Sequence, residues 1–281
     1  MWMKRTIGVM GGDRRQAELA RLLAKEGHRV CAWGVETLGT VEPVGLEEAT
    51  ACEVVILPLP LCREEGVLNC GEETISTRRL FRYFSPQQRI LAGQIESKQY
   101  REAELCGLTL EDYFLREEVT VANAAVTAEG AIQTAMEQLE RSLLGMDCLV
   151  LGFGRIGKLL SLRLAGLGAR VTVTARKSED LAWIRACGWK AVRTHELNGA
   201  LGTFDVVFNT IPSLILEESL LRQLPEECLC VDLASRRGID AAAAEGLGLK
   251  ILWARGLPGR LKPQTAAEIL RDAIHTILLE G

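Results

Sequence analysis

A glycine-rich turn between an apolar strand and a helix constrains this chain more than any other feature. The stretch 148–157 reads CLVLGFGRIG, and leucines at helical spacing follow it. A strand, a G-x-G-x-x-G turn and a helix in this order make up a dinucleotide site. Gly152 permits the tight turn, Gly154 lets backbone amides approach a pyrophosphate, and Gly157 lets the helix pack closely on the strand. The pyrophosphate would lie at the helix N-terminus, whose free N–H groups attract anions. The alternative is a plain structural turn.

The residues at the end of the next strand indicate which dinucleotide this would be. In an NAD site, an Asp or Glu at this position binds the ribose 2′-hydroxyl. Here the strand 169–175 is followed by Arg176 and Lys177, and the acid is missing. A guanidinium can bind a 2′-phosphate through two parallel hydrogen bonds, whereas a carboxylate would repel it. The sequence therefore predicts NADP(H) rather than NAD(H); the alternative is a solvated basic loop.

Composition sets the class of protein and excludes several partners. A chain of 281 residues is long enough for two domains, and 48% hydrophobic with 25% charged residues is ordinary for a soluble globular protein. The net charge of −4 gives no general attraction to nucleic acid or to an anionic membrane. No run approaches the roughly 20 apolar residues of a transmembrane helix, and the apolar N-terminal stretch is too short for a signal peptide. We therefore expect a cytoplasmic protein without nucleic-acid or membrane partners.

Cysteine and histidine spacing argues against disulfides and metals. The nine cysteines are odd in number, form no C-x-x-C pair, and in several cases lie inside apolar strands. This usage is typical of reduced thiols that act as small core residues. The three histidines, at positions 28, 195 and 275, have no metal-like spacing. We expect no metal site.

The N-terminal part repeats the order of strand, glycine turn, helix and strand. Gly11–Gly12 follows the strand 6–10, but no third glycine comes at the spacing of the second copy. A dinucleotide is therefore not expected at this turn. Asp13, Arg15 and Gln16 instead stand at the helix start, a place that suits a small anion. The alternative is that Asp13 only caps the helix.

The repeat of this order predicts the architecture. We expect an α/β fold with two doubly wound parallel-sheet domains around a cleft, because ligands collect outside the carboxyl ends of parallel strands. Residues 1–122 form a flavodoxin-like substrate-side domain and residues 123–263 a Rossmann NADP-binding domain. The amphipathic C-terminal helix, within 264–281, is expected to pack back on the first domain. Residues 62–86 are polar and rich in turns, which predicts a surface connection.

A helix is expected to carry the chain from the first domain to the second. The sequence from Asn123 onward has a helical pattern, with Thr127 as a candidate N-cap and Glu129 in the first turn. Glu129 is either a carboxylate of the cap region or a proton-handling residue. Both interpretations place it beside the expected cleft.

Taken together, six short motifs resemble those of the dipicolinate synthase A-subunit family of spore-forming bacteria. The resemblance covers nearly the whole chain. The motifs are GGDRRQ (11–16), TAEGAIQ (127–133), VLGFGRIG (150–157), NTIPS (209–213), DLASR (232–236), and GLPG (256–259) with Pro263 and Thr265.

This resemblance implies a two-domain relative of the 2-hydroxyacid and alanine dehydrogenases. It implies NADP-dependent oxidation of a dihydro- or hydroxytetrahydro-dipicolinate to dipicolinate, together with the flavoprotein-like B-subunit of dipicolinate synthase. It also implies the cytoplasm of the mother cell of a sporulating bacterium as the location. Assembly into a homo-oligomer is compatible with it.

The resemblance further implies which residues face substrate and which face cofactor. On the substrate side it places Asp13, Arg15, Gln16, Thr127 and Glu129. On the cofactor side it places Gly152, Gly154, Arg155, Ile156, Arg176, Thr210, Pro212 and Ala234, to which the turn and the basic loop add Gly157 and Lys177.

The chain departs from the family pattern at several positions. Residues 59–62 read LPLC where small hydroxyl residues are usual, and Ile156 stands where a threonine is common. Arg255 and Gln264 replace a usual proline and lysine. These departures bear on the contacts to substrate and to phosphate, and they do not touch the fold.

The implied chemistry needs a cation for carboxylates and a group that accepts a proton. Arg15 is the first candidate for binding a dicarboxylate, with Arg63 second. Glu129 is the candidate catalytic residue, since none of the histidines lies in a convincing acid–base position. Two alternatives remain: a dehydrogenase of a hydroxy or amino acid, and a nucleotide-binding subunit without chemistry of its own.

The basic loop yields a direct test of the cofactor prediction. Replacing Arg176 by Ala removes a charge-assisted contact, so NADPH should bind the variant about tenfold or more weakly. Fluorescence titration with NADPH measures this. Equal affinity of the variant and the parent would defeat the preference for NADP(H).

Overall fold

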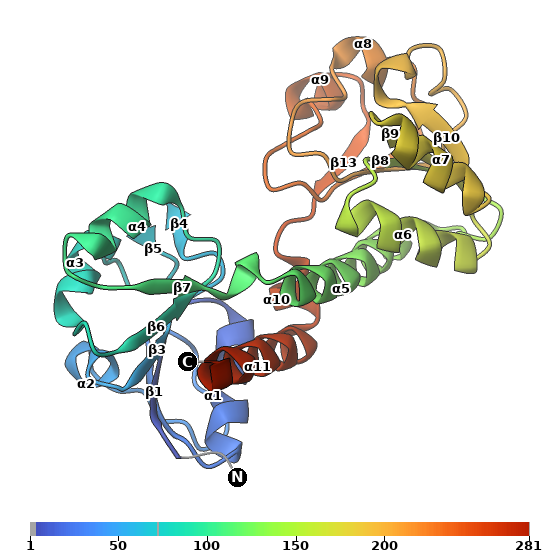
Figure 1. The fold of residues 1–281 in the computed structure, drawn as a ribbon. Coiled ribbons are helices and arrows are strands. Elements are labelled where there is room, and N and C mark those ends of the chain that lie inside the picture. Colours follow the sequence, from blue (N-terminus) through green and yellow to red (C-terminus); the bar gives the residue numbers. More distant parts are fainter. Residues whose placement is uncertain (1–3, 72, 281) are drawn as a thin grey trace. The chain divides into compact units, whose positions relative to one another are not determined.

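The chain folds into two compact units, which are described here one at a time. The structure is a computed structural model and describes residues 4–71 and 73–280 (Figure 1). The described residues up to Asn123 and those from Pro258 onward form unit 1, and Ala124–Leu257 forms unit 2. The sequence put these divisions after residues 122 and 263. Both divisions fall inside helices, α5 (Glu117–Met136) and α10 (Leu257–Leu261).

Unit 1 is built on a five-stranded sheet with the order β2-β1-β3-β6-β7 and only parallel pairs. In chain order this is 2-1-3-4-5, the flavodoxin-like arrangement that the sequence predicts. The elements of unit 1 before α5 are β1 (Thr6–Met10), α1 (Arg14–Lys25), β2 (Arg29–Trp33), α2 (Leu46–Thr50), β3 (Val54–Ile56), β4 (Cys62–Glu64), β5 (Val67–Leu68), α3 (Thr77–Leu80), η1 (Phe81–Tyr83), β6 (Arg89–Ala92), α4 (Ser97–Glu104), β7 (Leu110–Asp112) and η2 (Tyr113–Leu115).

Both faces of this sheet are covered, as a parallel sheet requires. Along β3 the side chains alternate: Val54 and Ile56 belong to one buried cluster and Val55 to another. The first cluster includes residues of α1 and α11 (Pro263–Glu280), and the second includes residues of α2, α3 and α4. These two sets of helices lie on opposite faces of the sheet (Figure 1).

The last helix completes the core of unit 1. α11 packs along α1 (Figure 1), and Leu270 and Ile274 are almost fully buried in the cluster that contains Leu19 and Leu23. Apolar residues at helical spacing on α11 therefore cover one face of the sheet although they come last in the sequence.

The segment 62–86 is part of the core of unit 1, so the prediction of a surface connection is wrong. It contains the antiparallel pair β4–β5 and the short helix α3, and Leu68, Leu80 and Phe81 are fully buried. Its apolar residues follow neither the helical nor the strand period over a useful length. They are buried in a short segment outside the main sheet, and sequence periodicity does not predict burial in such a segment.

Unit 2 has a six-stranded parallel sheet with the order β10-β9-β8-β11-β12-β13. In chain order this is 3-2-1-4-5-6, the Rossmann arrangement, and the predicted fold class of two doubly wound parallel sheets is confirmed. Its elements after α5 are β8 (Asp147–Leu151), α6 (Arg155–Gly166), β9 (Arg170–Ala175), α7 (Ser178–Ala186), β10 (Lys190–Arg193), η3 (Thr194–Glu196), β11 (Val206–Asn209), α8 (Glu218–Leu221), β12 (Leu229–Asp232), α9 (Ala241–Gly246) and β13 (Lys250–Trp253).

Six of the nine cysteines are buried, whereas Cys62 and Cys106 are half-buried and Cys187 is exposed. All nine are free thiols, and Cys148 and Cys230 are fully buried in strands of unit 2. Burial raises the pKa of Cys148 to about 12, so this thiol stays protonated and apolar in character.

Helix α5 begins eleven residues earlier than a helix capped by Thr127 would. It spans Glu117–Met136, so Thr127 lies inside the helix and caps nothing at its start. Acidic residues in the first turn, Glu117 and Glu118, favour this earlier start because they face the positive end of the helix dipole. The β-branched residues between 119 and 126 conceal the helix, since they favour strands when read alone.

The packing of α11 on α1 predicts that mutation of a buried residue of α11 lowers the free energy of unfolding much more than mutation of an exposed one. Leu270 is 2% exposed, so Leu270→Ala should lower the free energy of unfolding by about 2–5 kcal/mol through lost burial and a residual cavity. Leu279, on the same helix, is 73% exposed, and Leu279→Ala should change that free energy by about 0.5 kcal/mol or less. Urea denaturation measures both. Equal effects would show that α11 is not part of this core.

Candidate functional site

The glycine turn of unit 2 has the geometry of an open cradle at the start of a helix. Gly152 has φ +99°, a conformation that L side chains avoid, and a Cβ there would meet Thr210 Oγ1 at 2.6 Å. A Cβ at Gly157 would overlap the carbonyl oxygen of Gly152, so the helix passes directly against the turn. At Gly154, by contrast, an added Cβ would meet nothing within 4 Å. The first and third glycines are therefore required by the fold, and the second leaves space in front of the helix.

The N-terminus of α6 faces that space. Gly154 is the N-cap and has no side chain to satisfy the first N–H groups of the helix. Arg155 is exposed at the first helical position, and Ile156 is half-buried after it. Such an end attracts an anion such as a pyrophosphate through its N–H groups and its dipole.

Two threonines fix the strand ends below the turn. The hydroxyl of Thr174, fully buried on β9, accepts a hydrogen bond from the Gly152 N–H at 3.2 Å. The hydroxyl of Thr210, just after β11, donates to the carbonyl of Leu151 at 2.8 Å. The turn is thus held by both neighbouring strands, which limits how far it can relax.

The basic loop after β9 borders a pocket of about 380 Å³. Arg176 and Lys177 are exposed at the turn into α7, and Lys177 pairs with Glu179 at 3.4 Å. The pocket is lined by Arg176 together with residues that follow β10 and β11, among them Thr194, His195 and Leu214. It lies at the carboxyl ends of three strands of one sheet, where nucleotide halves bind in this fold.

A buried polar network holds the loops after β11 and β12, and the sequence alone did not reveal it. Asn209 and Asp232 are register partners at the ends of these strands, and Asn209 Nδ2 donates to Asp232 Oδ1 at 2.8 Å. The carboxylate of Asp232 also accepts from the N–H groups of Ala234 at 3.1 Å and Gly238 at 2.8 Å. Ala234 is buried beside this network, whereas Pro212 is exposed. In the sequence, the network could have been predicted from an amide and a carboxylate at the ends of two successive strands.

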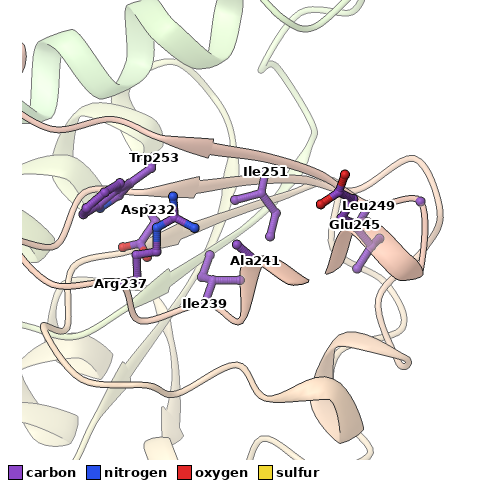
Figure 2. Close-up of a pocket in the computed structure, with 9 residues that line it drawn as sticks. Asp232, Arg237, Ile239, Ala241, Glu245, Leu249, Ile251 and Trp253 are labelled. Carbon is purple, nitrogen blue, oxygen red and sulfur yellow. The ribbon is translucent and has the colours of Figure 1, made fainter. Parts of the chain in front are cut away.

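A second pocket, of about 420 Å³, runs along β13 (Figure 2). Trp253, Asp232 and Arg237 group at one end and Glu245 lies at the other, with apolar residues between them. Arg237 lies over the Trp253 ring at 4.6 Å, and the indole N–H donates to the carbonyl of Ala234 at 3.3 Å. These contacts fix the loop that carries Ala234.

The backbone amides of the glycine turn of unit 1 already have protein acceptors. The N–H of Gly11 donates to the Trp33 carbonyl at 2.8 Å, and the N–H of Gly12 donates to the Asn69 carbonyl at 2.6 Å. Asp13 is the N-cap of α1 and accepts the Arg15 N–H at 3.0 Å. The turn therefore presents a carboxylate in place of free amides, and of the two interpretations drawn from the sequence the cap is the one seen here.

Arg15 directs its charge inward. Its guanidinium donates to Asp13 Oδ2 at 3.0 Å and to the Leu59 carbonyl at 2.9 Å, and the residue is only 5% exposed. Gln16 is fully buried. Asp13, with its side chain 37% exposed, is the accessible member of this pair. Arg63 is engaged as well, with the carbonyls of Cys70 and Gly71.

The remaining predicted site residues lie on α5 in unit 2. Thr127 is 7% exposed and Glu129 is exposed, two positions further along the helix. Asp13, Arg15 and Gln16 belong to unit 1. The predicted substrate-side residues are therefore divided between the units.

The structure brings together three metal-ligating groups that the sequence spacing did not. Glu26, His28 and His275 place one ligand atom each within 4.8 Å of one another. These groups already have protein partners: Glu26 pairs with His275 at 3.0 Å and with Arg271 at 3.6 Å, and His28 Nδ1 accepts the Arg5 N–H at 3.3 Å. Burial lowers the pKa of His28 and so favours its neutral form. The cluster ties α11 to the end of α1.

Comparison with known proteins was made on both sequence and fold. Residues 6–114 match the family described as the N-terminal domain of the dipicolinate synthase A-subunit, and residues 115–235 match the NAD binding domain of D-isomer specific 2-hydroxyacid dehydrogenases. The dipicolinate synthase A-subunit of Bacillus subtilis (strain 168) is 32% identical, over 98% of this chain and 96% of that protein. The chain belongs to the dipicolinate synthase A-subunit family.

Solved structures agree with the family assignment. The A chain of dipicolinate synthase from Bacillus subtilis superposes with a TM-score of 0.85 and 31% identity, covering all of this chain and 97% of that one. An L-alanine dehydrogenase has a TM-score of 0.67 and 16% identity over 97% of this chain and 88% of its own, which shows a shared fold only. This member of the family thus has a dehydrogenase-like NAD(P)-binding domain, and its family assignment implies an oxidoreductase. In the described part of the chain no helix has the length and apolar character to cross a membrane.

Substitution of Gly154 tests cofactor binding without disturbing the fold. At Gly154 an added Cβ meets no protein atom, so Gly154→Ala should fold normally but obstruct the pyrophosphate, lowering affinity for NAD(P)H about tenfold or more. Gly166→Ala, at the other end of α6 and equally unobstructed, is the matched control and should bind as the parent does. Calorimetric titration together with a thermal melt measures both properties. Unimpaired binding by Gly154→Ala would rule out this turn as the pyrophosphate site.

Proposed function

We propose that this protein catalyses the NADP-dependent oxidation of a dihydro- or hydroxytetrahydro-dipicolinate to dipicolinate, pyridine-2,6-dicarboxylate, together with a second, flavoprotein-like subunit. Membership of the dipicolinate synthase A-subunit family is the observation that carries the proposal. By the same resemblance we place the reaction in the cytoplasm of the mother cell of a sporulating bacterium.

The residues of unit 2 fit a phosphorylated nicotinamide dinucleotide. The space before Gly154 admits a pyrophosphate at the N-terminus of α6, and the pocket beside Arg176 has room for the adenosine end. Where an NAD site carries an acid, β9 ends in Ala175 followed by Arg176 and Lys177. These features support NADP over NAD. When bound, the cofactor would accept a hydride from the substrate ring.

The chain's own residues would then position the ring and take up a proton. Thr210, Pro212 and Ala234 lie on loops at the carboxyl ends of the central strands, and the Asn209–Asp232 network holds those loops in place. A rigid loop of this kind orients a reacting ring at little entropic cost. Formation of an aromatic pyridine supplies much of the driving force, and one carboxylate is sufficient to take up the proton.

On the substrate side we propose roles for Asp13, Arg15, Gln16 and Thr127 as binding residues. In unit 1 the buried guanidinium of Arg15 contacts Asp13 and the Leu59 carbonyl. We therefore propose that Arg15 orients Asp13, whose carboxylate would accept a hydrogen bond from a donor group of the substrate and would not meet a substrate carboxylate. Glu129, an exposed carboxylate on α5, is the proposed proton acceptor.

The proposed activity has a direct test. The purified chain, mixed with the second subunit, NADP⁺ and the dihydrodipicolinate precursor, should form dipicolinate and NADPH in equal amounts, followed by NADPH absorbance and product chromatography. A panel of hydroxy and amino acids offered in place of the precursor separates this activity from a related dehydrogenase. Turnover of a panel member in place of the precursor would refute the proposal.

Glu129→Gln tests whether this chain performs the chemistry. Loss of a proton acceptor should lower kcat by about 10²–10⁴-fold while NADPH affinity stays unchanged. Glu137→Gln, which alters an exposed carboxylate just past the end of α5, is the control and should leave kcat unchanged. Full turnover by Glu129→Gln would remove Glu129 from the mechanism. If Arg15→Ala were also fully active, the chain would be a nucleotide-binding subunit without chemistry of its own.

A further inference from the structure

A third arginine reaches the basic loop from the neighbouring strand. Arg193 is the last residue of β10, and its register partner on β9 is Ala175. The carboxyl end of β10 therefore lies beside the point where Arg176 starts the turn into α7. Seventeen positions of sequence separate the two arginines, so the motif alone does not connect them.

The side chain of Arg193 spans this turn. One guanidinium nitrogen donates to the hydroxyl of Ser178, the first residue of α7, at 3.0 Å, and another donates to the Arg176 carbonyl at 3.5 Å. The side chain remains 36% exposed, so part of it faces solvent while both ends of the turn are held. Arg176, Ser178 and Arg193 thus form one cluster with two guanidinium groups and one hydroxyl.

Acidic neighbours oppose an anion here, so the helix start alone does not make the site. Glu179 and Asp180 occupy the first turn of α7, and Glu179 already pairs with Lys177. Glu196 lies 4.0 Å from Arg193 Nε, a loose contact that leaves most of the guanidinium charge available. A phosphate monoester carries a charge of about −1.5 to −2 near pH 7, so more than one cation is needed to hold it against these carboxylates.

We propose that Arg193 is a specificity-determining residue that binds, with Arg176 and Ser178, the 2′-phosphate on the adenosine ribose of the cofactor. The inference rests on the proposed preference for NADP. The pocket of about 380 Å³ supplies the place for the attached adenosine, since Arg176 and Thr194 line it and Thr194 is the next residue after Arg193. The phosphate then lies between the pocket and the turn. Paired guanidinium groups suit its geometry through parallel N–H···O bonds.

A residue that only braces the loop and one that binds phosphate differ in what their loss affects. A residue that only holds the loop in place contributes equally to the affinities for NADH and NADPH, because both place an adenosine in the same pocket. A residue that binds the 2′-phosphate contributes to the affinity for NADPH alone. The ratio of the two affinities therefore separates the two roles.

The experiment uses the full chain and the variant Arg193→Gln, which keeps a hydrogen-bond donor for the loop but removes the charge. We expect NADPH affinity to fall about 10- to 100-fold, with NADH affinity unchanged. 2′-AMP should compete with NADPH more strongly than 5′-AMP on the parent, and this advantage should shrink in the variant. Arg193→Lys should give an intermediate loss, and Arg185→Gln, at the far end of α7, should bind both nucleotides as the parent does.

Three results would overturn the inference. If Arg193→Gln retains the NADPH-to-NADH ratio of the parent, Arg193 does not read the phosphate, and the proposed function is untouched. If both affinities fall together, Arg193 is a bracing residue. If the parent itself shows no preference for NADPH, the proposed NADP specificity fails and this inference fails with it.

Discussion

The close passage of α6 against the end of β8 is the constraint on which the arrangement of unit 2 depends. A side chain at Gly157 would overlap the carbonyl of Gly152, so strand and helix meet with no atom between them. This contact points the first N–H groups of α6 into the space before Gly154. The hydroxyls of Thr174 and Thr210 tie the same turn to both neighbouring strands. A helix N-terminus held in this way by packing suits a pyrophosphate, because its backbone N–H groups are in place before any ligand arrives.

The two glycine turns show how similar sequences produce different surfaces. Both follow a first strand and precede a first helix. In unit 1 the amides of Gly11 and Gly12 donate to carbonyls from β2 and from the loop after β5, and Asp13 caps the helix. Every one of these contacts satisfies a donor that an anion would otherwise use. The difference lies in what surrounds the turn, and a long-range carbonyl such as that of Asn69 cannot be read from the motif.

The fold was largely predictable from sequence, and the site only in part. Apolar strand runs closed by glycine or proline predict the strands of both parallel sheets, and helical spacing predicts α11. Each of these signals is local in the sequence. The early start of α5 was not predicted because β-branched residues favour strands when read alone. The burial of residues in 62–86 was not predicted because their apolar residues are irregularly spaced. The glycine fingerprint located the cradle because its mechanism lies within one short segment.

Residues that meet through the sheet register were beyond the reach of motif analysis. Arg193 lies beside Arg176 because β10 pairs with β9, and Asn209 bonds to Asp232 because β11 pairs with β12. In both cases the strand ends place side chains together at the carboxyl edge of the sheet, where ligands bind. Register is set by the whole sheet and not by the residues concerned. In a doubly wound sheet, the residues at the ends of adjacent strands must therefore be considered together with the first βα turn, because the register brings them to the edge of the sheet where ligands bind.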